Sequence, residues 1–217
     1  MEEFVILSNN YLSRRTKAYY TFDYYAREDN ENTSFILDFK NTFANFNIHR
    51  LNLSKEKAKN ILKQALTEII EKNDLYKPII VAVPRAKALD TYKPVQLYLL
   101  DTIREVAQEM KNTIDGTNYI RRIINTKTTH LSSDIGRVTR QGQIFKGENA
   151  NDGSEPYVGI TKDTCSIFAE KFKGRTVILI DDIYTKTVNI DEDCIQAIYE
   201  AGAREVYFYA FAKTARR

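Results

Sequence analysis

Residues 177–189 read VILIDDIYTKTVN, and they join an apolar run, a pair of acids and a turn rich in hydroxyl groups. The apolar run predicts a buried strand that ends at Asp181 and Asp182, and a helix is expected after the turn. In an open α/β sheet, ligands bind beyond the carboxyl ends of the strands, where the next helix begins. Two carboxylates can accept hydrogen bonds from sugar hydroxyls or hold a hydrated Mg²⁺. The turn and the helix N-terminus offer backbone N–H groups to a phosphate, so the stretch predicts a site for a phosphorylated sugar.

The remaining sequence alternates strands and helices in the manner of a parallel α/β sheet. Strands are predicted over residues 18–25, 34–39, 79–83, 119–124, 176–180 and 205–211, and helices over 54–72, 95–111, 163–172 and 190–201. Ser54 is the expected N-cap of the first of these helices. This order predicts a parallel sheet flanked by helices, with right-handed crossovers. We expect a single domain, with residues 1–77 as an N-terminal strand and helix hood and residues 78–217 as the core.

The composition favours a soluble, globular protein with a weak positive charge. The chain has 217 residues, 43% hydrophobic and 28% charged, with a formal net charge of +3. Its basic residues are scattered, so a nucleic-acid surface is not demonstrated. Cys165 and Cys194 lack CxxC spacing, which argues against a zinc site and for reduced thiols in the cytoplasm. No apolar run approaches the ~20 residues of a membrane span, and the first ten residues do not resemble a secretory signal.

The stretch at 177–189 resembles the binding signature of type I phosphoribosyltransferases. In that family an apolar strand leads into two acids, two further residues and a Thr/Ser/Gly phosphate loop, so Asp181 and Asp182 match the acidic pair. Tyr184 and Thr185 match the version common in the ComF-like branch. The resemblance covers roughly residues 79–214 and implies a Rossmann-like fold. It also implies 5-phosphoribosyl-1-pyrophosphate (PRPP) as the donor, Mg²⁺ as the cofactor, and an often dimeric assembly.

The resemblance assigns roles to three segments of this chain. Asp181 and Asp182 would hold the ribose hydroxyls and Mg²⁺. The turn after them would bind the 5′-phosphate, through Tyr184, Thr185, Lys186, Thr187, Val188 and Asn189. The loop after the strand at 79–83 would grip pyrophosphate, through Pro84, Arg85, Ala86 and Lys87. Residues 130–145 would form a flap in which Arg137 and Arg140 close over the leaving pyrophosphate.

Two departures from the family pattern concern the phosphate turn. Thr187 stands where the family usually has Gly, and a β-branched residue resists the positive φ that Gly adopts there. Lys186 can offset this loss with a direct charge on the phosphate, or it can signal a different ligand. The sequence therefore leaves three hypotheses open. They are a phosphoribosyltransferase, a non-catalytic protein on the same fold that senses a nucleotide or assists in DNA handling, and an RNA-binding regulator.

Other phosphate-binding families are excluded by their motifs. The chain contains no GxxxxGK[ST] loop and no GxGxxG after a strand. A DxDxT phosphatase loop needs its carboxylates two residues apart, whereas Asp181 and Asp182 are adjacent. The acceptor that would receive the ribosyl group is not determined by the sequence.

Overall fold

The computed structural model describes residues 1–25, 33–39, 47–126, 160, 163–186 and 188–215, together with the backbone of two short strands. These two strands, β6 (Arg137–Val138) and β7 (Ile144–Phe145), pair with each other.

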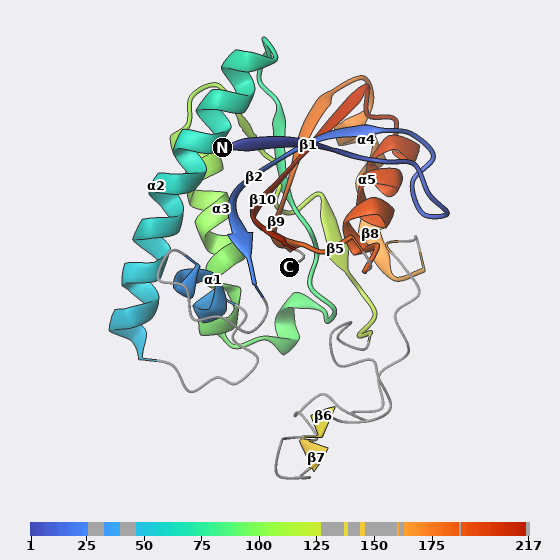
Figure 1. The fold of residues 1–217 in the computed structure, drawn as a ribbon. Helices are drawn as coiled ribbons and strands as arrows, with labels where there is room; N and C mark the ends of the chain where they lie inside the picture. The colour runs from blue at the N-terminus through green and yellow to red at the C-terminus, as the bar shows by residue number, and fades with distance from the viewer. Residues whose placement is uncertain are drawn as a thin grey trace.

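A six-stranded sheet forms the centre of the molecule, in the order β1-β2-β10-β9-β3-β4 (Figure 1). Its strands are β1 (Glu2–Ile6), β2 (Thr16–Tyr24), β3 (Ile79–Ala82), β4 (Ile114–Asp115), β9 (Thr176–Tyr184) and β10 (Glu205–Thr214). Only β1 runs antiparallel to its neighbour within this sheet; the other pairings are parallel. The predicted α/β class with a mostly parallel sheet is therefore confirmed.

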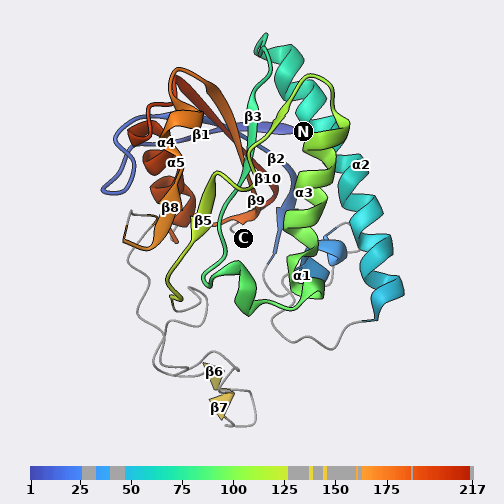
Figure 2. The same ribbon diagram turned by 180° about the vertical axis from the view of Figure 1, so that it is seen from behind.

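Helices cover both faces of the sheet, as Figures 1 and 2 show. One face carries α1 (Ser34–Phe39), α2 (Ile48–Lys72) and α3 (Tyr98–Glu109). The other carries α4 (Ala169–Phe172), α5 (Ile190–Glu200) and a small antiparallel pair, β5 (Ile120–Arg122) with β8 (Cys165–Ile167). Two 3₁₀ turns, η1 (Leu89–Thr91) and η2 (Pro94–Leu97), precede α3. The layers explain the continuous apolar run of β9, because Val177 and Leu179 face one core while Ile178 and Ile180 face the other.

The N-terminal third contributes directly to the sheet. β2 lies beside β10 in parallel register, with Ala18 opposite Phe208, and β1 forms the sheet edge. α2 packs with α3 over the face that β2, β10, β9 and β3 share.

Three predicted elements differ from the structure. Residues 34–39 form α1 and not a strand, because Phe35, Ile36 and Phe39 recur at helical spacing and are buried together. α2 begins at Ile48, ahead of the predicted Ser54, because the Asn47 side chain accepts hydrogen bonds from the first amides of the helix. Residues 163–172, predicted as a helix, contain β8 followed by the single turn of α4.

The remaining predicted elements are confirmed with shifted bounds. β9 and β10 each run past their predicted ends, so Asp181 and Asp182 lie inside a strand and Lys213 lies inside β10. Lys213 is held between two rings, with its Nζ 5.1 Å from the centroid of Phe4 and 4.9 Å from that of Tyr20. The predicted strand at 119–124 shortens to β5, which lies outside the main sheet.

Candidate functional site

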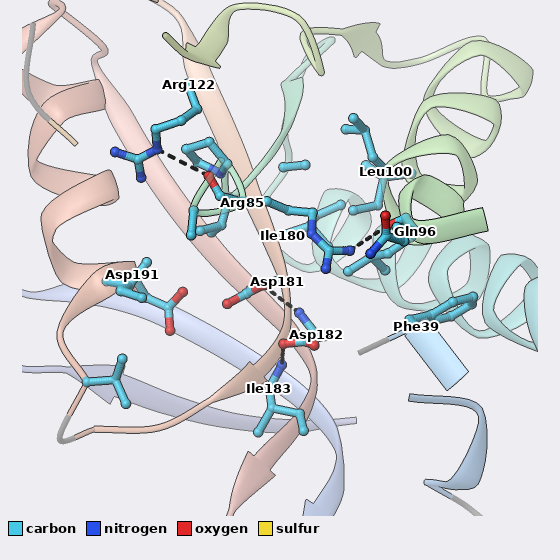
Figure 3. A pocket seen from close by; sticks show the side chains of 18 of the residues that line it. Phe39, Arg85, Gln96, Leu100, Arg122, Ile180, Asp181, Asp182, Ile183 and Asp191 are labelled. Atoms are coloured by element: carbon cyan, nitrogen blue, oxygen red, sulfur yellow. Dashed lines mark hydrogen bonds between the residues drawn. The ribbon is translucent and has the colours of Figure 1, made fainter. Parts of the chain in front are cut away.

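A cavity of about 280 Å³ opens where β3 ends beside the carboxyl-terminal half of β9 (Figure 3). The two strands are parallel neighbours, and the Val83 amide donates to the Ile180 carbonyl at 2.9 Å, which holds the loop after β3 against β9. The cavity therefore lies beyond the carboxyl ends of adjacent strands, where open α/β sheets bind their ligands. Its polar lining comes mainly from β9, the loop after β3, β5 and the start of α5.

The opposite wall of the cavity is apolar. Phe39 comes from α1, and Leu99, Leu100 and Ile103 come from α3. Figure 3 shows Phe39 and Leu100 on one side and Asp191 on the other, with the two aspartates of β9 between them. A wall of this kind accommodates an uncharged ring or a sugar face, while the acidic side supplies hydrogen-bond acceptors.

Asp181 and Asp182 both line the cavity. The Asp181 Oδ1 accepts the Asp182 amide at 2.8 Å, and the Asp182 Oδ1 accepts the Ile183 amide at 2.7 Å. Each carboxylate is thus oriented by the amide of the next residue. The Asp181 carboxyl group also interacts with a neighbouring acid on α5.

That acid is Asp191, which the sequence analysis did not single out. Asp191 lies in the first turn of α5, is 4% exposed, and lines the cavity. Its carboxyl group faces that of Asp181 in Figure 3, and the two acids interact. Burial, and then the charge of Asp181, raises the pKa of Asp191 well above its ordinary value, so this acid holds its proton more tightly than an exposed aspartate does.

The loop after β3 brings Arg85 to the cavity and fixes it there. Of the four residues predicted to grip pyrophosphate, Pro84, Arg85 and Ala86 line the cavity and Lys87 does not. The guanidinium of Arg85 lies 4.6 Å from the ring centroid of Tyr92, and its Nη1 donates to the Gln96 carbonyl. These contacts hold the Arg85 side chain beside Gln96 at the cavity (Figure 3).

Arg122 of β5 is a second cavity residue that sequence reasoning missed. It is 4% exposed, and its Nε donates to the Arg85 carbonyl at 3.1 Å. Thr126 adds two bonds to the Ala86 carbonyl, from its amide at 2.8 Å and from its hydroxyl at 2.9 Å. The loop is therefore anchored from the β5 segment, which preorganises it for a ligand.

The turn after β9 reaches the cavity only in part. Thr185 and Val188 line it, while Lys186 is exposed and lies outside it. The Val188 amide donates to the Thr185 carbonyl at 2.9 Å, and the Thr185 hydroxyl bonds that of Thr214 at 2.8 Å. The protein therefore already uses two of the groups that were predicted to bind phosphate.

Asn189 and Tyr184, also predicted at the phosphate site, contact other parts of the protein. Asn189 adopts a left-handed backbone (φ 60°), and its Oδ1 accepts a hydrogen bond from Asn9 at 3.1 Å. Tyr184 is 5% exposed and lies in the core beneath α5, where its hydroxyl donates to Glu192 at 2.8 Å. Neither lines the cavity.

Several predicted residues lie outside the part of the chain that the structure describes. These are Thr187, Arg140 and the side chain of Arg137, whose backbone belongs to β6. The predicted roles of these residues in the phosphate turn and the flap remain predictions.

Among the described residues, no group of three or more histidine, cysteine or acidic side chains is placed to hold a metal ion. One oxygen of Asp181 and one of Asp182 already accept backbone amides. The residues present therefore fit a Mg²⁺ that arrives bound to a phosphorylated ligand better than a resident ion, since Mg²⁺ is commonly held by one or two carboxylates plus substrate phosphates.

Comparison with known proteins gives no assignment: the sequence matches no protein-family model and no curated protein. Within the described residues, no helix combines the length and the apolar character needed to cross a membrane.

Proposed function

We propose that the chain binds a phosphorylated ribose compound, PRPP or a nucleotide, in the cavity at the ends of β3 and β9. One observation carries this proposal: Asp181 and Asp182 share a single cavity with the anchored loop that carries Arg85. A sugar phosphate needs hydrogen-bond acceptors for its hydroxyl groups next to a cation for its phosphate, and this cavity offers both. The resemblance of residues 177–189 to the phosphoribosyltransferase signature supports the same ligand.

If the protein is an enzyme, the reaction is ribosyl transfer at C1′. The bond from C1′ to the pyrophosphate oxygen breaks, pyrophosphate leaves with the bonding electrons, and the acceptor forms the new bond to C1′. Asp181 and Asp182 would orient the ribose through its hydroxyls, and their charge would favour the positive charge that develops on the ring. Arg85 and Arg122 would stabilise the departing charge. Bound Mg²⁺ would add neutralisation of the pyrophosphate oxygens.

A non-catalytic binder on the same fold is the second candidate, and the positions of the cations favour it. Lys87 and Lys186 lie outside the cavity, and Arg85 already donates to the Gln96 carbonyl. The described residues therefore offer a leaving pyrophosphate fewer direct charges than the sequence predicted. A nucleotide sensor or a nucleic-acid-handling protein needs to bind a ligand without stabilising such a leaving group.

Calorimetric titration of PRPP, with and without Mg²⁺, tests the proposal. We expect Asp182→Asn to weaken binding more than tenfold, because the carboxylate charge is lost. The thermal midpoint should stay close to that of the wild type, because the amide oxygen can still accept the Ile183 amide. Asp23→Asn is the matched control, since Asp23 is an exposed aspartate on β2 outside the cavity.

Equal affinity of the Asp182→Asn variant and the wild type would contradict the assignment. A screen for pyrophosphate release over purine, pyrimidine and amine acceptors then separates the two candidates. Release with any acceptor identifies a transferase, whereas tight binding without release identifies the non-catalytic protein.

A further inference from the structure

An exposed cation lies just before each of the five parallel strands of the main sheet. These cations are scattered in the sequence, but parallel strands begin at the same edge of a sheet, so the fold brings them together. The edge lies at the opposite end of the strands from the cavity, which the carboxyl-terminal half of β9 lines. In the order of the strands β2, β10, β9, β3 and β4, the cations are Arg15, Arg204, Arg175, Lys77 and Lys111, and we call them the basic edge.

Backbone hydrogen bonds hold the starts of neighbouring strands together at this edge. The Arg204 amide donates to the Arg175 carbonyl at 2.8 Å, and the Ile114 amide donates to the Pro78 carbonyl at 3.0 Å. Figures 1 and 2 show the turn before β3 and the loops before β9 and β10 at the top of the molecule. Because neighbouring strands lie about 4.8 Å apart, the basic edge extends over roughly 20 Å across the sheet.

The side chains of the basic edge form no ion pairs with the described part of the chain. Three lysines of α2, in contrast, are paired with acids of α3. Arg204 donates to the Thr176 hydroxyl at 2.9 Å, and the neighbouring acid Glu205 is hydrogen-bonded by Tyr207. Exposed cations that are gathered on one edge without such pairing attract a polyanion.

An exposed aromatic ring lies at the same edge. Tyr76 is 81% exposed in the turn before β3, and the Nζ of Lys77 lies 5.8 Å from its ring centroid. A ring beside a cation can stack on a nucleobase while the cation contacts a phosphate. The bases of a duplex are already stacked on one another, so a projecting ring favours a single strand. Three of the five cations are arginines, whose planar guanidinium groups bind two phosphate oxygens at once.

We propose that the basic edge binds single-stranded nucleic acid, with its cations on the phosphates and Tyr76 stacked on a base. This site is separate from the cavity and does not rest on the proposed function. Cations that contact phosphates release counterions, so the affinity falls as the salt concentration rises. For a single strand, the slope of log affinity against log salt is about −0.7 for each neutralised phosphate, which gives about −3.5 for the five cations.

The experiment measures fluorescence anisotropy of labelled oligo(dT) and oligo(U) of about 15 nucleotides, at several salt concentrations. Arg175→Gln and Lys111→Gln should each reduce the steepness of the slope by about 0.7, because each variant loses one phosphate contact. Tyr76→Ala should weaken the affinity about fivefold or more and leave the slope unchanged, because no charge is removed. Arg121→Gln is the matched control, since Arg121 is an exposed cation on β5, outside the main sheet.

Shallower slopes in Arg175→Gln and Lys111→Gln, with the wild-type slope in Arg121→Gln, support the inference. Unchanged slopes in the first two variants overturn it. So does tighter binding of an oligo(dA)·oligo(dT) duplex, or co-sedimentation with phosphatidylserine vesicles in the absence of single-strand binding. A wild-type slope near zero overturns it without any variant. Displacement of the oligonucleotide by ribose 5-phosphate also overturns it, because the strand would then occupy the cavity. Titration of PRPP tests the proposed function separately.

Discussion

Replacing Tyr184 by phenylalanine is expected to destabilise the protein and leave ligand binding intact. The sequence pattern places Tyr184 beside the ligand, but the structure places its hydroxyl 2.8 Å from Glu192, a carboxylate that is 1% exposed. The second oxygen of Glu192 is buried without a partner among the described residues. Tyr184 is therefore the side chain that donates to a buried acid, and its removal leaves that acid less well satisfied.

The magnitude follows from the charge on the acceptor. A hydrogen bond to a charged group contributes about 1.5–3 kcal/mol, and a bond between neutral groups contributes about 1 kcal/mol. Burial raises the pKa of Glu192, and the Tyr184 bond opposes this shift. In the folded protein the pKa of Glu192 therefore lies above its ordinary value of 4.5. As the pH rises from about 4.5 through this raised pKa, the folded protein becomes less stable relative to the unfolded chain. Without the Tyr184 bond the pKa rises further and the range widens upward.

We therefore expect Tyr184→Phe to cost about 1 kcal/mol at pH 4 and about 2–3 kcal/mol at pH 8, measured by urea unfolding. Tyr209→Phe is the matched control, because the hydroxyl of Tyr209 is also buried but bonds the neutral Thr21 at 2.8 Å. Its cost should not vary with pH. In a Glu192→Gln background, the pH dependence of the Tyr184→Phe cost should disappear. A cost that is equal at both pH values, or a tenfold loss of ribose 5-phosphate affinity at unchanged stability, would refute this reasoning.

Two further substitutions test the anchored loop and the packing behind it. Arg122→Met removes the hydrogen bond to the Arg85 carbonyl, and we expect this variant to bind ribose 5-phosphate about tenfold more weakly. The control is Arg121→Met, at an exposed neighbouring position, which should bind ribose 5-phosphate as the wild type does in the same titration. Gly116→Ala should cost about 1–3 kcal/mol in urea unfolding, because a Cβ at this position would overlap the buried Cγ2 methyl of Ile79; unchanged stability would show that the region repacks freely.

The sequence predicted the sheet strands beside the cavity because their patterns are unambiguous. β3, β9 and β10 are buried on both faces, and such strands are continuous apolar runs in the sequence. Two runs that end in Val83-Pro84-Arg85 and in the Asp181–Asp182 pair must have their carboxyl ends at the same edge if the strands are parallel. The cavity between these two segments followed from that rule and is present in the structure.

The sequence failed to predict an element where its apolar pattern was too short. It failed to predict a cavity residue where burial of the side chain decided that residue's place. Residues 34–39 are too few for the helical spacing of Phe35, Ile36 and Phe39 to exclude a strand, and their packing against α2 favours α1. Asp191 and Arg122 carried no motif. Acids in the first turn of a helix usually interact with its dipole at the surface, so the burial of Asp191 could not be read from its position. Arg122 lay in a predicted strand, and the loop that it anchors is 37 residues away in the sequence.

An acid-rich cavity can bind an anionic sugar because its charge is smaller than its composition suggests. Asp181, Asp182 and Asp191 line the cavity together with Arg85 and Arg122. Burial, and then the charge of Asp181, raises the pKa of Asp191 and favours its neutral form, and two guanidinium groups line the same cavity. The acids can then accept hydrogen bonds from sugar hydroxyls while the guanidinium groups attract an incoming phosphate.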